Sequence, residues 1–509
     1  MKQQNKRFRN QIINLKEMNK SLKERNLVDN SQYAILQSFE DDESILCFLT
    51  RFAKKVNNPH FKTTYPLPLR TFAVTLHYLS PRAYRYLRSK FGNCLPSSST
   101  LKNWYKSIDG SPGFSMQALG ALTELCKDQI VILAILKDEM HLRENYCNGK
   151  GRVQFGHSGE TLNDCNLLEE LANQALVFMA VGVKPKFKIL LGYFLIRSLT
   201  AEQSASLTRL CCQNVFQCGE NIDLVSCAFN GMATNLSMCT ILKANLDLNN
   251  LDPFFDIEGK KVGIVLDPPH MLKNVRNMFG THKIFFDASD RKINFEYLEL
   301  LVEVQAQIGL QLGNKVKSKH IVYKDQKMKV SLATELLSLS TANALAFLKN
   351  ELKVKCFQES GPTITFIQNM NNAFDILNSR SNSQNPYKQP MTAGNISFFQ
   401  DFYDSFINYI KSLKYSQKGK LKFIYTSQIK TGFIGLVISL KTCIEIGKRL
   451  ILIDKKIESF SVHFIIQDHL ECFLYLFSVF RSMNGYNPNP NVVQFDAAFK
   501  KILMDSLFN

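Results

Sequence analysis

Acidic residues stand next to or inside apolar segments at two widely separated places in the chain. Seven apolar residues, 130–136, run without a break and are followed two positions later by Asp138. Glu471 and Asp468 lie in a second apolar segment, where a charge is costly unless it faces a partner or an ion. Carboxylates are the ligands that Mg²⁺ prefers, and two such ions can stabilise the attacking and leaving oxygens of a phosphodiester. These acids therefore indicate metal-dependent phosphodiester chemistry, with a plain solvated strand end as the alternative for Asp138.

A run of strands has to position the first acid. The apolar run is typical of a strand buried on both faces, and we expect that strand to end at Asp138. The pattern predicts further strands at 174–182, 188–196, 222–229 and 260–266, with helices at 200–216 and 235–245. Three strands with short connections, followed by helix, strand, helix and strand, predict an α/β fold with an RNase H-like mixed sheet.

Helical spacing dominates the chain beyond residue 276. It predicts helices at 295–312, 329–349, 364–377, 396–413 and 464–480, and the last of these carries Asp468 and Glu471. A large helical region therefore separates the strands from the second acid.

The N-terminal part predicts two binding modules. Apolar and Asn residues at heptad spacing within 1–30 predict a short dimerising coiled coil, with a frayed basic helix as the alternative. Within 60–115, a helix at 81–90 and a second one capped by Ser99 or Ser98 resemble a helix-turn-helix. Its candidate DNA contacts are Arg82, Arg85, Lys102, Asn103 and Lys106.

The overall charge supports a polyanionic partner. The formal net charge is +18, which favours nucleic acid over a membrane surface, although a generally basic surface is the alternative. Cysteines lack zinc-finger spacing and indicate reduced thiols inside the cell. No apolar run approaches the roughly 20 residues of a membrane span, so we expect no membrane association.

Several ordered blocks resemble the P-element transposase family, which includes the THAP-domain transposase relatives. The most specific are LKDEM, VLDPPHMLKNVRN, KMKVSLATELLS, FDILNSR and QDHLECF. The resemblance implies an RNase H-like catalytic core in two parts, 125–284 and 451–509, interrupted by a helical GTP-binding insertion at 285–450. The zinc finger that usually precedes the coiled coil in that family is not found in this sequence, so we interpret the chain as a truncation, a fragment or a derivative that has lost it.

The resemblance also assigns the catalytic positions. It implies that Asp138 and Glu471 are the first and last catalytic, metal-binding acids. Asn230 stands in CAFNG, where the family has its second acid. An amide carries no charge, so we expect Mg²⁺-dependent cleavage to be impaired. We interpret Asp267, which ends the next strand, as a neighbour of the site and not as a replacement for the missing acid. Its alternative role is to cap the following helix.

Nucleotide contacts follow from the resemblance alone, because no Walker-type glycine loop is present. They are carried onto Lys329, Val330, Ser338, Asp375 and Asn378. Asp468, one turn before Glu471, is added to the cofactor-contacting residues as a supporting position.

The resulting hypothesis is a P-element-like DNA transposase of the nucleus, with Mg²⁺ and GTP as cofactors. Its partners would be transposon ends, target DNA and further copies of itself. The rival hypothesis is a non-catalytic DNA-binding or regulatory protein, and Asn230 is the residue that favours it.

Overall fold

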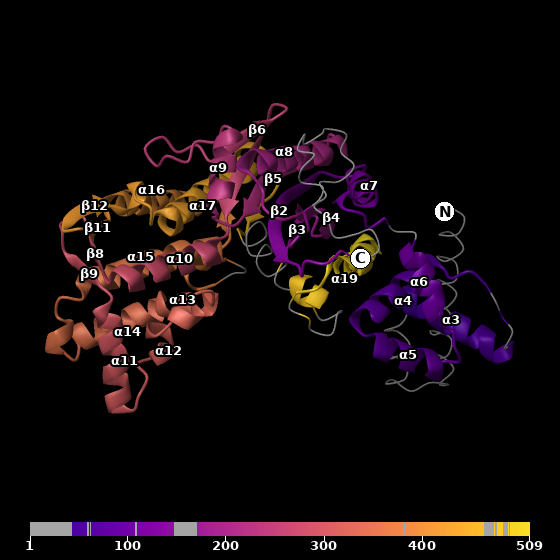
Figure 1. Ribbon diagram of the computed structural model, residues 1–509, viewed down its shortest axis with the longest axis horizontal. Helices are drawn as coiled ribbons and strands as arrows, with labels where there is room; N and C mark the ends of the chain where they lie inside the picture. The colour runs from indigo at the N-terminus through magenta and orange to yellow at the C-terminus, as the bar shows by residue number, and fades with distance from the viewer. Residues whose placement is uncertain are drawn as a thin grey trace. The chain divides into compact units, whose positions relative to one another are not determined.

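The structure is a computed structural model of the whole chain, and its chain trace is shown in Figure 1. It describes residues 43–58, 61, 63–106, 109–146, 170–379, 383–462, 473, 476–481, 487 and 489–508. The chain forms two compact units. One comprises Met1–Gly110 with Asp496–Asn509, and the other comprises Ser111–Phe495. The predicted coiled coil at 1–30 lies outside the described residues, as do Glu471 and Asp468.

The first unit is helical in its described part. Its N-terminal helices are α3 (Glu43–Asn57), α4 (Leu67–Leu79), α5 (Pro81–Lys90) and α6 (Ser98–Lys106). Ser80 caps α5 by accepting the Ala83 N–H, as proline at the first helical position favours. The cap of α6 is Ser97, whose hydroxyl accepts the Thr100 N–H at 3.1 Å, so the predicted Ser98 or Ser99 cap is wrong.

A seven-stranded mixed sheet forms the centre of the second unit, in the order β1-β4-β3-β2-β5-β7-β6. Strand β2 pairs antiparallel with β3 and parallel with β5, and β5 pairs parallel with β7. This arrangement confirms the predicted RNase H-like mixed sheet. The strands are β1 (Gly113–Phe114), β2 (Val131–His141), β3 (Gln174–Lys184), β4 (Lys188–Ile196), β5 (Ile222–Phe229), β6 (Phe254–Ile257) and β7 (Lys260–Leu266).

Strand β2 is longer than predicted. It continues to His141, so the prediction that Asp138 ends the strand is wrong. Asp138 pairs with Val177 of β3, and this backbone pairing is indifferent to side-chain polarity. On the other side, pairing with β5 stops at Leu136 opposite Ala228. The polar end of β2 therefore extends past the end of β5, and Asn230, the residue that follows β5, lies beside Asp138.

Helices pack against this sheet and against one another. They are α7 (Met116–Leu125), α8 (Ala201–Gln217), α9 (Ala233–Ile241) and α10 (Pro268–His282). Helix α8 begins at a capping box made by Thr200 and Gln203. Helix α17 (Thr431–Lys448) contacts β7, because the Ser439 hydroxyl donates to the Leu266 carbonyl and accepts its N–H.

Between α10 and α17 lies a mostly helical region. Its helices are α11 (Glu296–Ile308), α12 (Ser318–Ile321), α13 (Val330–Leu336), α14 (Leu339–Asn350), α15 (Gly361–Leu377) and α16 (Ile396–Ser412). A four-stranded sheet, in the order β12-β11-β8-β9, is formed by β8 (Ile284–Phe286), β9 (Lys292–Asn294), β11 (Lys414–Gln417) and β12 (Lys420–Phe423).

The single helix predicted at 329–349 is wrong, because Ser338 caps a new helix there. Among the described residues, one stretch, Val330–Asn350, has the length and hydropathy of a membrane span. It is divided between α13 and α14, which have 7 and 12 residues, and neither helix alone is long enough to span a membrane.

Short elements complete the described chain. They are β10 (Met391–Thr392) paired with β13 (Ser459–Phe460), the single turns Lys324–Gln326, Lys355–Phe357, Pro386–Lys388 and Ile424–Thr426, a π-helical turn Arg449–Ile453, and α19 (Val492–Phe508).

Candidate functional site

Three polar side chains meet where β5 ends beside β2. Asn230 follows β5 directly, and its Nδ2 lies 3.4 Å from Oδ1 of Asp138 and 3.2 Å from Oε2 of Glu139. Asp138 and Glu139 are half-buried, so their charges are partly removed from water. The amide therefore donates toward both carboxylates and neutralises none of their charge.

The orientation of the Asn230 amide is fixed from its other side. Its Oδ1 accepts the backbone N–H of Met232 at 3.2 Å and Nδ2 of Asn235 at 2.9 Å. A backbone N–H can only donate, so the amide oxygen has to face Met232. Rotating the amide by half a turn would set its NH₂ against two donors and its oxygen against two carboxylates. The NH₂ group is thus held toward the acids.

This geometry does not fit a two-metal centre. A hard divalent ion needs oxygen ligands, whereas the group aimed at Asp138 and Glu139 is an N–H donor. Within the described residues, no group of three or more His, Cys, Asp or Glu side chains is arranged to hold a metal ion. The described part of the site therefore offers two carboxylates whose shared side is filled by an amide.

Glu139 is a site residue that the sequence reasoning did not single out. Burial raises the pKa of its carboxyl group, and the neighbouring charge of Asp138 raises that pKa further. Lys137 and the Asn230 hydrogen bond act in the opposite direction. The signal in the sequence was the pair of adjacent acids directly after the apolar run.

Beneath these acids lies a buried lysine. Lys137 is 1% exposed, and its Nζ donates to the Ser204 hydroxyl at 2.7 Å and contacts Sδ of Met238 at 3.2 Å. Burial lowers the pKa of its ammonium group. Alternation along β2 places Lys137 and Glu139 on the same face, where opposite charges attract.

Asp267 directly follows β7, and its backbone N–H donates to the Phe229 carbonyl at 3.0 Å. Its carboxylate accepts no hydrogen bond from the backbone N–H groups at the start of α10, so the predicted capping by the side chain is wrong. One carboxylate oxygen instead pairs with Nδ1 of His270, and the other is buried without a hydrogen-bond partner among the described residues.

Hydrogen bonds connect the residue that follows one predicted nucleotide contact, Ser338, to another predicted contact, Asp375. Ser338 caps α14, and the next residue, Leu339, donates its N–H to Oδ1 of Asn371 at 3.0 Å. Asn371 in turn donates from Nδ2 to Oδ2 of Asp375 at 3.0 Å. The network therefore joins the start of α14 to the end of α15.

Asp375 is held by three side chains. Besides Asn371, Asn385 donates to Oδ2 at 3.1 Å, and Nζ of Lys388 lies 3.4 Å from Oδ1. Burial raises the pKa of the Asp375 carboxyl group, against the opposing effect of Lys388. Asn385 also lines a cavity of about 670 Å³, whose other walls are Leu339, Thr365, Gln368, Asn369, Asn372, Gln384, Pro386 and Tyr387.

The remaining predicted nucleotide contacts lie elsewhere. Lys329 is exposed at the start of α13, and its backbone carbonyl accepts from Nη2 of Arg276 on α10 at 3.3 Å. Val330 is the first residue of α13. Asn378 follows α15, and its Oδ1 is buried without a hydrogen-bond partner in the described part of the chain.

The candidate DNA contacts lie on α5 and α6. Arg82 and Arg85 are exposed on α5, and Lys102 and Asn103 are exposed on α6. Lys106 ends α6, and its side chain lies outside the described part of the chain.

Comparison with known families agrees with this architecture segment by segment. Four family models match the chain in order: a P transposase-like HTH domain at 21–104, and TNP-like RNase H N-terminal, GTP-binding insertion and RNase H C-terminal domains at 110–243, 269–390 and 465–500. The chain belongs to the P-element-like transposase family. The matched set includes the GTP-binding insertion domain that interrupts the RNase H-like fold of this family.

Two individual proteins are also similar to this P-element-like chain. It is 27% identical to human (Homo sapiens) DNA transposase THAP9 over 332 residues, which are 62% of the chain and 35% of that protein. The chain thus spans about a third of the length of this curated relative. The solved Drosophila P element transposase strand transfer complex has a similar fold, with a TM-score of 0.70, 19% identity, and coverage of 92% of this chain and 98% of that one.

Proposed function

We propose that this P-element-like protein binds DNA and a guanine nucleotide, and that its Mg²⁺-dependent DNA cleavage and strand transfer are impaired by Asn230. The observation that carries the impairment is the Asn230 amide, whose NH₂ is directed at Asp138 and Glu139 by the Met232 N–H. In this proposal Glu471 supplies the third catalytic position.

DNA binding is supported by the matched HTH domain and by the exposed basic residues of α5 and α6. The solved relative is named as a strand transfer complex, and the human relative is named a DNA transposase. Transposon ends and target DNA are therefore the proposed substrates, in the nucleus. We further propose that the protein acts as a homodimer or a higher oligomer.

GTP binding is supported by the matched insertion domain. The network around Asp375 provides a carboxylate, two amides and a lysine next to a cavity. Because Asp375 is already hydrogen-bonded within the protein, guanine would have to replace one of these partners. The unpartnered Oδ1 of Asn378 is an acceptor that a guanine N–H would satisfy.

Restoring the acid tests this function. Asn230→Asp should raise Mg²⁺- or Mn²⁺-dependent cleavage of DNA carrying the element's ends, and adding Asp138→Ala should remove the gain. Residues that act as one catalytic unit lose nearly all activity when one is lost. DNA affinity should be the same in all three proteins, which separates catalysis from binding. Strong cleavage by the unmodified protein would contradict the proposal.

The second candidate function is a non-catalytic DNA-binding regulator. The same amide favours it, because a carboxylate-to-amide change at a metal site removes a charge while preserving shape. If Asn230→Asp gains no cleavage although DNA binding is retained, this second function is the better account.

A further inference from the structure

A long acid-free segment runs through the second unit. Residues 405–444 contain seven lysines and no Asp or Glu. Five of these lysines lie at or near the β11–β12 hairpin: Lys411, Lys414, Lys418, Lys420 and Lys422. In a chain that contains 44 acidic residues, this is a strong local separation of charge.

The hairpin presents these lysines to solvent. Gln417 pairs with Lys420 across a two-residue turn, in which Lys418 and Gly419 have φ angles of 51° and 75°. Two positive φ angles are typical of a type I′ turn, where Asn and Gly are the usual residues. Every residue from 416 to 423 is exposed. The hairpin is therefore a two-stranded ribbon whose tip and outer strand are in water.

Most of the charge on this ribbon is uncompensated. Lys414 forms an ion pair with Asp290 at 2.7 Å. By contrast, the side chains of Lys418, Lys420 and Lys422 make no ion pair or hydrogen bond within the described residues. Lys420 and Lys422 lie two positions apart on one strand and so point to the same side of the ribbon. Adjacent like charges repel, and a polyanion would relieve that repulsion.

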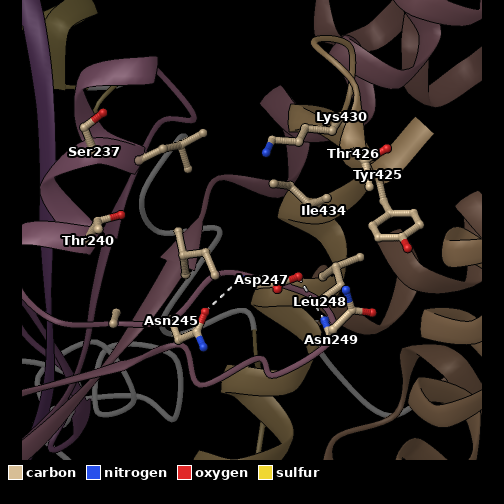
Figure 2. A pocket seen from close by; sticks show the side chains of 13 residues that line it. Ser237, Thr240, Asn245, Asp247, Leu248, Asn249, Tyr425, Thr426, Lys430 and Ile434 are labelled. Carbon is tan, nitrogen blue, oxygen red and sulfur yellow. Dashed lines mark hydrogen bonds between the residues drawn. The ribbon is translucent and has the colours of Figure 1, made fainter. Parts of the chain in front are cut away.

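The chain leads from the ribbon to the neighbourhood of the catalytic acids. Lys430 follows β12 and, with Tyr425, lines a pocket of about 770 Å³ (Figure 2). Figure 2 shows Ser237 and Thr240 of α9 across the pocket from Lys430. Helix α9 begins at Ala233, three residues after Asn230. The lysines thus extend from the hairpin toward the helix that follows the site.

We propose that the β11–β12 hairpin is a second DNA-binding element, which contacts the phosphate backbone of duplex DNA through Lys418, Lys420 and Lys422. This proposal rests on the proposed DNA-binding function and adds an interaction outside the HTH domain. Two-stranded ribbons are an established shape for binding duplex DNA. The lysines contact phosphates, so the element positions DNA without reading its sequence.

The test is the salt dependence of binding to a duplex of arbitrary sequence, in EDTA so that cleavage plays no part. The variant Lys418→Asn/Lys420→Gln/Lys422→Gln should bind more weakly, and its log–log salt slope should be shallower by about 0.9 for each phosphate that the variant no longer neutralises. Lys418→Asn alone should keep or raise the melting temperature, because Asn tolerates a positive φ better than Lys. If the triple variant keeps its melting temperature too, its weaker binding to DNA does not come from misfolding.

A matched control is available in the same unit. Lys349→Gln/Lys353→Asn/Lys355→Gln removes three charges near the end of α14, and Lys353 also has a positive φ of 47°. This control should leave the affinity and slope close to those of the unmodified protein. Equal slopes for the hairpin variant and the unmodified protein, or an equal decrease in both variants, would overturn the proposal. Neither result depends on whether Asn230→Asp restores cleavage.

Discussion

At the scale of single residues, the central feature is the Asn230 amide at the end of β5, where the resemblance to the family implies a carboxylate. The Asn230 amide is nearly the same shape as Asp, but it can donate hydrogen bonds where Asp can only accept them. Two carboxylates side by side repel, and the amide NH₂ reduces that cost without any ion. The acid pair is therefore tolerated in the folded protein in the absence of metal.

The raised pKa of Glu139 predicts a pH dependence of stability. The folded protein holds the Glu139 proton to a higher pH than the unfolded chain does, because burial and Asp138 raise its pKa above 4.5. The folded state binds more protons in that range, so this group's contribution to the free energy of unfolding falls as pH rises. Glu139→Gln should remove this fall.

Denaturant unfolding of both proteins at pH 4 to 8, values chosen to span roughly the ordinary Glu range and neutrality, measures this difference. The stability of Glu139→Gln relative to the unmodified protein should increase with pH and then level off. A constant difference across the range would show that Glu139 has an ordinary pKa.

Sequence reasoning predicted some residues of this site and missed others for a physical reason. Asp138 was predicted because it follows a conspicuous apolar run, and Asn230 because its neighbours resemble a family motif. Glu139 was missed because pairing with β3 carries the strand past its apolar part. The orientation of the Asn230 amide is fixed by hydrogen bonds from Met232 and Asn235. These hydrogen bonds depend on how the chain turns after β5, which the sequence pattern does not show.

At the scale of elements, five of the seven strands of the main sheet could be predicted, because long buried strands have distinct apolar runs. Strands β1 and β6 were not predicted, because they are only two and four residues long. The break between α13 and α14 could not, because apolar spacing continues through it and only the Ser338 cap marks the new helix. That break is where the chain reaches Asn371 and, through it, Asp375. The proposed nucleotide site thus depends on ends of helices that periodicity does not locate.

The helical insertion yields a prediction about GTP. A ligand that binds only the folded state stabilises it by about 2.7 kcal/mol at 100 times its dissociation constant. GTP at that level should raise the melting temperature of the unmodified protein, and most of this rise should be absent in Asp375→Ala. Asp375→Ala also removes the interactions with Asn371, Asn385 and Lys388, which changes the melting temperature without GTP. The quantity compared between the variant and the unmodified protein is therefore the rise in melting temperature that GTP produces.

Asp401→Ala is the matched control, because Asp401 is an exposed acid on α16 in the same region. It should keep the full response to GTP. An equal response to ATP would show that the site does not select guanine, and an unchanged response in Asp375→Ala would place the nucleotide elsewhere.

At the scale of the whole molecule, we expect the DNA-binding and GTP-binding segments to keep their function and the catalytic segment to have lost part of its function. The chain carries the HTH, RNase H-like and GTP-binding segments of its family in order. Its net charge of +18 suits a DNA-binding protein. By contrast, Asn230 concerns only the few atoms of the proposed metal site. We therefore expect the protein to bind DNA without efficiently holding the catalytic metal.

The most direct test of this claim is a titration with Mn²⁺, followed by electron paramagnetic resonance, of the unmodified protein, Asn230→Asp and Asn230→Asp/Asp138→Ala. We expect Asn230→Asp alone to gain a saturable Mn²⁺ site, because it replaces the amide NH₂ with an oxygen ligand beside Asp138 and Glu139. If the unmodified protein binds Mn²⁺ as tightly as Asn230→Asp does, and Asp138→Ala abolishes that binding, the claim that the amide blocks the metal site is wrong.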